Sequence, residues 1–262
     1  MAVRYELSRD SGVSESIGFL LIFAIIITGI ALVTLYGYPL LLQQQVSADE
    51  KIMEKNMIVL QNDIKSLAYK TVPYKETSLK ISGGSLTVYD SSLAHSPTIE
   101  ISYPNCPITP SSPCEPFKSG ELRYESIEAQ TDISLQNGAV VMRPRIQQGS
   151  TMLAEPRWII DKQPGSNTVV ITLIDITSDS IMAKEGIGTV KMALFGDPLV
   201  YPYTSSPTQL SVKFAEDSDP KYHVAWENYF ESLGMRKSGD SYIFDDVDKL
   251  YIKKYIIQIK GI

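Results

Sequence analysis

The chain has 262 residues, of which 44% are hydrophobic and 21% charged, and its formal net charge is -6. This hydrophobic content excludes a disordered chain, and the acidic balance argues against a nucleic-acid-binding protein, whose phosphate contacts need a basic surface. These averages conceal an uneven distribution, because the 33 positions from Ser16 to Ala48 contain no charged residue.

A transmembrane helix is predicted over residues 17–40, after a polar leader at residues 1–16. The apolar stretch from Ile17 to Tyr38 would form a helix about 33 Å long, enough for a hydrocarbon core of roughly 30 Å. Such a long uncharged run favours a membrane helix over a buried core helix.

The flanking charges predict the orientation of this helix. Arg4 and Arg9 precede it, and the next basic residue is Lys51. Because basic residues are enriched in cytoplasmic flanks, we expect a single-pass protein in the cell membrane with a cytoplasmic N-terminus and an extracytoplasmic C-terminal domain.

A removable secretory signal is the competing interpretation. The small residues Val46 to Ala48 resemble a cleavage site. However, the apolar region of a signal is about 7–15 residues, shorter than this run, and the cut would fall inside the next predicted helix.

An amphipathic extension of the same helix is predicted over residues 41–72, ending near Tyr69. Pro39 is expected to kink the helix, because its ring removes one hydrogen bond and crowds the previous turn. Apolar residues at spacings of three, four or seven form a narrow seam: Val46, Met53, Met57, Leu60, Ile64 and Leu67. The seam is predicted to pack on the chain's own β domain, with packing against copies of the same helix as the alternative.

An extracytoplasmic β-rich domain is predicted over residues 75–262. The period changes to two after Thr77, and Gly83-Gly84 predicts a tight hairpin turn between residues 78–82 and 85–89. Further short strands are expected at the following ranges: 98–103, 139–146, 158–161, 168–176, 189–195, 209–214, 241–244 and 250–259.

One helix is predicted among these strands, opened by Ser218-Asp219-Pro220 and closed by Gly234. Its apolar residues make one stripe at helical spacing: Tyr222, Ala225, Trp226, Tyr229, Phe230 and Leu233. We interpret the stripe as a core face packed on a sheet, rather than as an aromatic ligand-binding face. The predicted fold class is therefore α+β, mainly β: a long N-terminal transmembrane and amphipathic helix followed by an antiparallel β-sandwich-like domain with one packed helix.

The two cysteines lie eight positions apart in a proline-rich loop. Outside the cytoplasm, Cys106 and Cys114 are predicted to form a disulfide. A metal pair is the alternative, but His95 and His223 stand at no motif spacing.

No catalytic motif is present, since the sequence lacks a P-loop, a GxGxxG after a strand, an HExxH and a GxSxG. We therefore predict no enzyme, no catalytic residue, no metal and no cofactor. There are two acidic clusters, the first of Glu216, Asp217 and Asp219 and the second of Asp245, Asp246 and Asp248. Neither matches EF-hand spacing, so solvated turns are preferred to calcium sites.

The N-terminal residues SGVSESIGFLLIFAIIITGIALV, followed by an amphipathic helix and a β-rich domain, resemble archaeal type IV pilin-like and archaellin-like proteins. The likeness is to a membrane-anchored branch in particular, and it is strongest over residues 9–45. In that family a peptidase removes the leader, and the apolar segment then packs in a filament core.

The resemblance places the cleavage between Gly12 and Val13. Ser11 stands where the family has a basic residue, and Glu15 would be the third mature residue, whereas the family's acidic residue is the fifth. Independently of the family, Glu15 is a carboxylate in the first helical turn, where the helix dipole stabilises it.

The function expected is that of a non-enzymatic, pilin-like surface protein anchored by one helix. Whether the protein also assembles through that helix into a pilus-like structure is left open. Its partners would be the lipid bilayer and copies of itself, and no nucleic acid. The alternative is a singly anchored envelope protein that does not polymerise and whose β domain binds an extracellular ligand.

Overall fold

The computed structural model describes residues 10–70, 72–93, 96–106, 112–216 and 222–262, and for residues 10–15 and 203–208 it describes the backbone alone. The chain divides into two compact units, Met1–Ala48 and Asp49–Ile262. The boundary therefore lies inside the segment predicted as an amphipathic extension, and the helical residues from Asp49 onward belong with the β domain.

The helices follow the predicted order. Their bounds are α1 Asp10–Leu32, a π-helical turn η1 Val33–Gly37, α2 Tyr38–Tyr69 and α3 His223–Ser232. The predicted end of the N-terminal helical region at Tyr69 is confirmed. The residues proposed to open the last helix, Ser218 to Pro220, lie outside the described residues.

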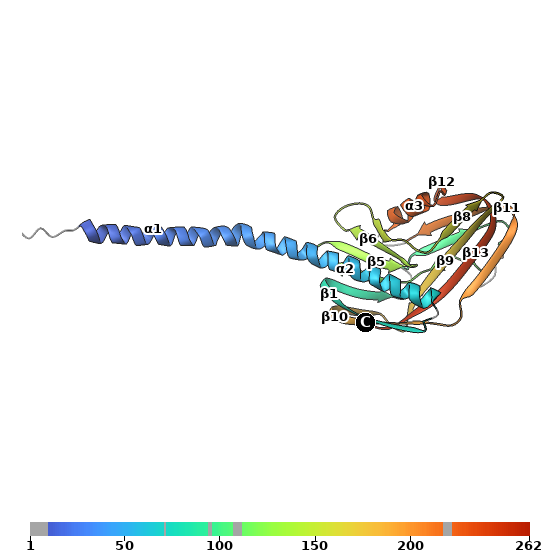
Figure 1. Cartoon of the computed structure of the whole chain (residues 1–262), viewed down its shortest axis with the longest axis horizontal. Helices are drawn as coiled ribbons and strands as arrows, with labels where there is room; N and C mark the ends of the chain where they lie inside the picture. The colour runs from blue at the N-terminus through green and yellow to red at the C-terminus, as the bar shows by residue number, and fades with distance from the viewer. Residues whose placement is uncertain (1–9, 71, 94–95, 107–111, 217–221) are drawn as a thin grey trace, which may run out of the picture. The chain divides into compact units, whose positions relative to one another are not determined.

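The C-terminal unit is a mostly antiparallel β-sheet domain, which confirms the predicted α+β, mainly β class (Figure 1). Its strands are β1 Tyr74–Tyr89, β2 Thr98–Ser102, β3 Phe117–Lys118, β4 Glu121–Ser126, β5 Thr131–Gln136, β6 Ala139–Pro144, β7 Thr151–Ala154, β8 Ile159–Gln163, β9 Ser166–Ser178, β10 Met182–Leu194, β11 Leu199–Ala215, β12 Arg236–Ser238 and β13 Ser241–Gly261.

Hydrogen bonds join these strands into one sheet, whose main path runs β3-β2-β11-β13-β10-β1-β4-β5-β6-β7. The long strand β13 also pairs with β12 and, in parallel, with β9, from Lys249 opposite Thr168 to Ile259 opposite Ser178. The two strands predicted at residues 241–244 and 250–259 are thus parts of one strand.

The hairpin predicted at Gly83-Gly84 is wrong. The strand β1 continues through both glycines and pairs with β10 on either side of them, with a register shift between Ile81 and Leu86. Gly83 has a φ of +69°, and a Cβ at Gly84 would collide with the Glu125 carbonyl. The two glycines therefore form a bulge that lets β4 approach closely, a role that glycine also fills in strands.

Two hydrophobic cores lie in the domain, and several strands contribute to both. Along β9, Val169 and Ile171 belong to the first core, whereas Ile174 and Ile176 belong to the second. Because successive side chains of a strand point to opposite faces, this strand is buried on both faces and reads as a nearly continuous apolar run.

Each core is covered by one helix. The part of α2 that belongs to the C-terminal unit lies against β1 and β5 and closes the second core (Figure 1). The helix α3 closes the first core with the stripe predicted for it, of which Trp226 and Phe230 are fully buried. The interpretation of the stripe as a core face is therefore confirmed.

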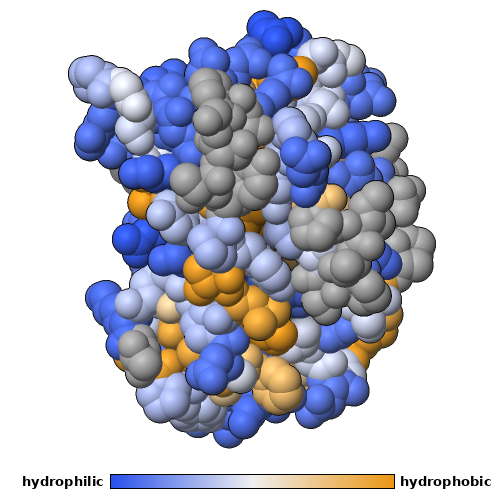
Figure 2. Space-filling view, turned by 90° about the vertical axis from the view of Figure 1, so that its right-hand side faces the viewer, coloured by the Kyte–Doolittle hydropathy of each residue, from blue (hydrophilic) through white to orange (hydrophobic). Residues whose placement is uncertain are grey.

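The side of the domain seen in Figure 2 is mainly hydrophilic, with a group of hydrophobic residues in its lower half. Large apolar side chains are mostly inside this unit, as its two cores require.

Candidate functional site

The apolar part of the N-terminal helical region is exposed to the solvent along its described length. Ile17, Phe23 and Leu35 have exposed fractions of 56%, 51% and 67%. An 18-residue window in the helical stretch Ser16–Tyr69 reaches a mean hydropathy of 2.8 with none of its residues buried. The helix is thus long and apolar enough to cross a membrane.

The two threonines inside this stretch form hydrogen bonds from their hydroxyl groups to backbone carbonyls of the same helix. Thr28 Oγ1 donates to the Ala24 carbonyl at 2.7 Å, and Thr34 Oγ1 donates to the Ile30 carbonyl at 2.9 Å. Because both hydroxyls are bonded to the preceding turn, they add little polar surface to the outside of the helix.

A change of helical hydrogen bonding stands next to Pro39. The turn η1 is π-helical, and the Tyr38 N–H donates to the Val33 carbonyl, five residues back. Such a widened turn adapts the helix to a proline ring, which crowds the preceding turn. A π-helical turn therefore stands immediately before Pro39, and the kink expected at this residue stays a prediction.

The residues implied in leader cleavage are in helical backbone. Gly12, Val13 and Glu15 all lie within α1, which begins at Asp10. The side chains of Val13 and Glu15 are outside the described part of the chain, so the dipole interaction expected for Glu15 stays a prediction.

The predicted seam divides between the two units. Met53, Met57, Leu60, Ile64 and Leu67 are all fully buried in the second core. Val46 precedes the boundary at Ala48 and is half-buried. From Met53 onward, packing on the chain's own β domain is confirmed over packing against copies of the helix.

Gln61 is a packing residue that the periodicity did not reveal. It is 1% exposed, and its Nε2 donates to the Gly138 carbonyl at 2.7 Å and to the Glu155 carbonyl at 2.9 Å. The amide thus satisfies two backbone carbonyls, one in the turn between β5 and β6 and one just after β7, that α2 would otherwise cover without partners.

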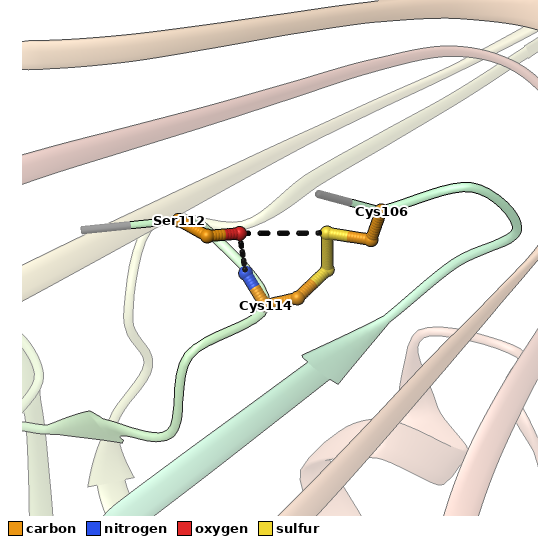
Figure 3. Close-up of a disulfide and its surroundings, with 3 residues drawn as sticks. All are labelled: Cys106, Ser112 and Cys114. Atoms are coloured by element: carbon orange, nitrogen blue, oxygen red, sulfur yellow. Dashed lines mark hydrogen bonds between the residues drawn. A yellow bond between two sulfur atoms is a disulfide. The ribbon is translucent and has the colours of Figure 1, made fainter. Parts of the chain in front are cut away.

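The disulfide between Cys106 and Cys114 is present, with a Cα–Cα distance of 6.3 Å. Ser112 supports it from inside the loop (Figure 3): its Oγ accepts from the Cys114 N–H at 3.2 Å and lies 3.7 Å from Cys106 Sγ. The bond closes the loop between β2 and β3, at one end of the sheet.

A cavity of about 380 Å³ lies beside this loop, with Ser112, Pro113 and Phe117 in its lining. Lys254 Nζ pairs with Asp175 Oδ2 at 3.1 Å in the same lining, and the Lys254 ammonium lies 5.1 Å from the centre of the Phe117 ring. Its volume lies in the range of small-ligand pockets, and its lining combines apolar residues with several serines and charged residues.

A buried charge network on β4 and β5 was not expected from the sequence. The Arg123 guanidinium lies between Glu121 and Glu125, and Arg145 Nε donates to Asp132 Oδ1 at 2.8 Å. Glu121 and Asp132 are 1% and 4% exposed, so their pairing with guanidinium groups is required to bury them. These carboxylates serve the structure rather than offering a free acid or base.

The network also reaches the start of α3. Burial and the Glu121 carboxylate raise the pKa of Tyr222 well above its ordinary value.

The only sequence signal for the charge network on β4 and β5 was an alternation of polar and apolar residues. The same alternation is typical of a strand with one solvated face, so it did not indicate that the charged residues are buried.

The acidic clusters serve as hydrogen-bond acceptors where they are described. Glu216 accepts the Tyr222 N–H at 2.7 Å and the His223 N–H at 3.0 Å, which caps the first turn of α3. Asp245 pairs with Arg236, and Asp248 accepts the Asn167 N–H at 2.7 Å. Asp217 and Asp219 lie outside the described residues.

Comparisons with known proteins give one match. A model described as "Family of unknown function (DUF7289)" matches residues 11–254. Neither the curated proteins nor the solved structures contain a match to this chain.

Proposed function

The chain belongs to DUF7289, a family of unknown function, and we propose that it is a non-enzymatic surface protein anchored in the cell membrane by one N-terminal helix. Its C-terminal β domain would lie outside the cytoplasm. In this proposal the organisation is pilin-like: an apolar helical segment leads into an amphipathic segment that packs on a β-rich domain.

The observation that carries the proposal is the opposite burial of the two helical segments. The large side chains from Ile17 to Leu42 are exposed, whereas those from Met53 to Leu67 on the seam are covered by the β domain. About 25 cal/mol per Å² favours removing apolar surface from water, so the uncovered segment needs an apolar environment, which a bilayer supplies.

The extracytoplasmic location is supported by two features. Arg4 and Arg9 precede the apolar segment, and the first basic residue after it is Lys51. The bond between Cys106 and Cys114 is of a kind that persists in oxidising compartments outside the cytoplasm.

Assembly into a pilus-like structure is the second candidate, because the same exposed helix could pack against copies of itself in place of lipid. The seam from Met53 onward is already buried in the chain's own β domain. Helix-to-helix contacts between copies would therefore involve only the part of the helix in the N-terminal unit. A non-polymerising protein whose β domain binds a ligand is the alternative, and the cavity beside Phe117 and Lys254 favours it.

Mass spectrometry of the N-terminus tests the anchor. The full chain is expressed in cells, and the membrane fraction is washed with alkaline carbonate before extraction in detergent. A membrane-retained protein that starts at Met1, Ala2 or Val13 supports the anchor, whereas a soluble protein that starts at Asp49 overturns it. Digestion of intact cells by an added protease tests the orientation, since a β domain that survives until the cells are lysed contradicts an outer location.

Shearing of the cells separates the two candidates. A protein that starts at Val13 and sediments with sheared filaments supports assembly. An intact leader, together with extraction as small particles in detergent, supports the anchored form that does not polymerise.

A further inference from the structure

A groove lies between the C-terminal part of α2 and the chain segment from Met152 to Trp158. Its volume is about 930 Å³, the helix contributes Asn62 and Lys65 to its lining, and Lys70 follows the end of the helix at Tyr69. All these residues belong to the C-terminal unit. The groove is separate from the cavity beside the disulfide loop, with which it shares no lining residue.

Three cations meet in this groove: Lys65, Lys70 and Arg157. The Arg157 guanidinium lies 4.6 Å from the centre of the Tyr69 ring, which fixes its plane. Lys65 Nζ donates to the Glu155 backbone carbonyl at 3.3 Å. The Glu155 side chain adds one negative charge to the lining, against three positive ones.

The three cations of the groove are not neutralised by salt bridges. In the part of the chain that the structure describes, none of the three lies within 4.0 Å of a carboxylate oxygen, as is also true of several other lysines of the domain, whereas Arg123, Arg145 and Lys254 all have such a partner. Burial, together with the charge of Arg157, lowers the pKa of Lys65 below its ordinary value. The lining of this groove therefore carries more positive than negative charge, in a chain whose net charge is -6.

We propose that this groove binds an extended, acidic segment of a partner protein. The length of the groove fits such a segment, because the seven helical steps from Asn62 to Tyr69 cover about 10 Å, the length of about three residues of extended chain. Carboxylates two residues apart on the segment would lie on one face and reach the cations together.

Charge complementarity favours a short acidic segment over a nucleic acid. A nucleic acid would extend beyond the groove over a surface with net negative charge, which repels a long polyanion. A short peptide meets only the local positive potential of the groove.

Fluorescence anisotropy of a labelled peptide tests the proposal on the full chain in detergent. The probe has about nine residues, with Glu at alternate positions that share one face of an extended chain. The matched probe carries Gln at the same positions, and a single-stranded oligonucleotide of equal charge is the third ligand. We expect the Glu peptide to bind at least about tenfold more tightly than the Gln peptide. Added salt should weaken the binding of the Glu peptide.

Two double variants locate the binding site. Lys65→Gln with Arg157→Gln removes two charges from the groove, and Arg236→Gln with Lys237→Gln removes two from the surface near α3, where both cations have acidic partners. We expect the groove variant to lose at least about tenfold in affinity and the control to lose less than about twofold. Lys70→Gln, at an exposed position, should weaken binding without a change in the melting temperature.

Several results would overturn the proposal. These are no binding of the Glu peptide, equal binding of the Gln peptide, tighter binding of the oligonucleotide, and equal losses in the two double variants. If the groove variant fails to fold, Lys70→Gln decides, and unchanged affinity in that variant counts against the groove.

Discussion

The two units of the chain differ in the burial of their apolar helical side chains. Phe23, in the N-terminal unit, is 51% exposed, whereas Leu60, in the C-terminal unit, is fully buried although both residues belong to helices. The apolar residues of the first unit are therefore available to contact its surroundings, whereas those of the second unit stabilise its own fold. Changes in the first unit should therefore alter where the protein is found, and changes in the second should alter how stable it is.

The largest effect should follow from charges in the exposed helix. Ile22→Lys with Ile26→Lys places two charges in the apolar segment, at a cost of about 5–7 kcal/mol for insertion. We expect the protein to leave the carbonate-washed membrane fraction, while the melting temperature of its β domain stays unchanged.

The matched control for that experiment is Ile22→Leu with Ile26→Leu, which keeps the apolar surface and should keep the protein in the membrane. Retention of the lysine variant at the level of this control would contradict the assignment of the N-terminal unit to the bilayer.

Truncation of the buried seam should produce the next largest effect. Leu60→Ala leaves a cavity in the second core, and we expect a loss of about 2–5 kcal/mol in the free energy of unfolding. Urea titration of the full chain in detergent measures this, with the fluorescence of the buried Trp158 and Trp226 as the signal.

Ile26→Ala is the counterpart in the exposed helix and should change the same free energy by less than about 0.5 kcal/mol. Equal losses in Leu60→Ala and Ile26→Ala would remove the distinction between the units.

Removal of the disulfide should have a moderate effect confined to the C-terminal unit. Cys106→Ser with Cys114→Ser frees a short loop, and the chain-entropy model predicts a loss of about 2–3 kcal/mol. A reducing agent should lower the stability of the natural chain by a similar amount and leave that of the variant unchanged. If the reducing agent has no effect on the natural chain, the bond does not stabilise the domain.

The smallest effect is expected from the buried cap of α3. Burial raises the pKa of Glu216 above its ordinary value of 4.5, despite the hydrogen bonds that favour its charged form. The folded state therefore binds this proton more tightly than the unfolded state does. The resulting stabilisation is present below the ordinary pKa and is lost as the pH rises through the raised pKa.

Urea titrations at several pH values compare the natural chain with Glu216→Gln, which stays neutral. The stability of the natural chain relative to the variant should increase as the pH falls from 7 through this window. A relative stability that decreases over the same range would show that the pKa of Glu216 is lowered in the folded state.

Much of the helical structure could be predicted because its signals are local. The seam from Met53 to Leu67 and the stripe around Trp226 follow the helical period, and both are buried as that period requires. The pairing of Cys106 with Cys114 was also predictable, since these are the two cysteines of the chain.

The burial of charged residues on β4 and β5 was missed for a physical reason. Glu121, Arg123 and Asp132 alternate with apolar residues as on a strand with a solvated face, yet Glu121 and Asp132 are buried through ion pairs between strands. The turn predicted at Gly83-Gly84 failed similarly, because a close approach of Glu125 uses the same residue type as a tight turn does.

The sequence by itself determined the features that depend on neighbouring residues: the long apolar helix, its amphipathic continuation and the mainly β character of the rest. Which segment packs on each face of the sheet and of α2 follows only from the three-dimensional fold. Gln61 meets the carbonyls of Gly138 and Glu155, and Lys65 and Arg157 share one groove, although 77 to 94 positions separate the hydrogen-bonded partners. Such contacts have no period along the chain, because they arise only when the sheet brings distant segments against the helix.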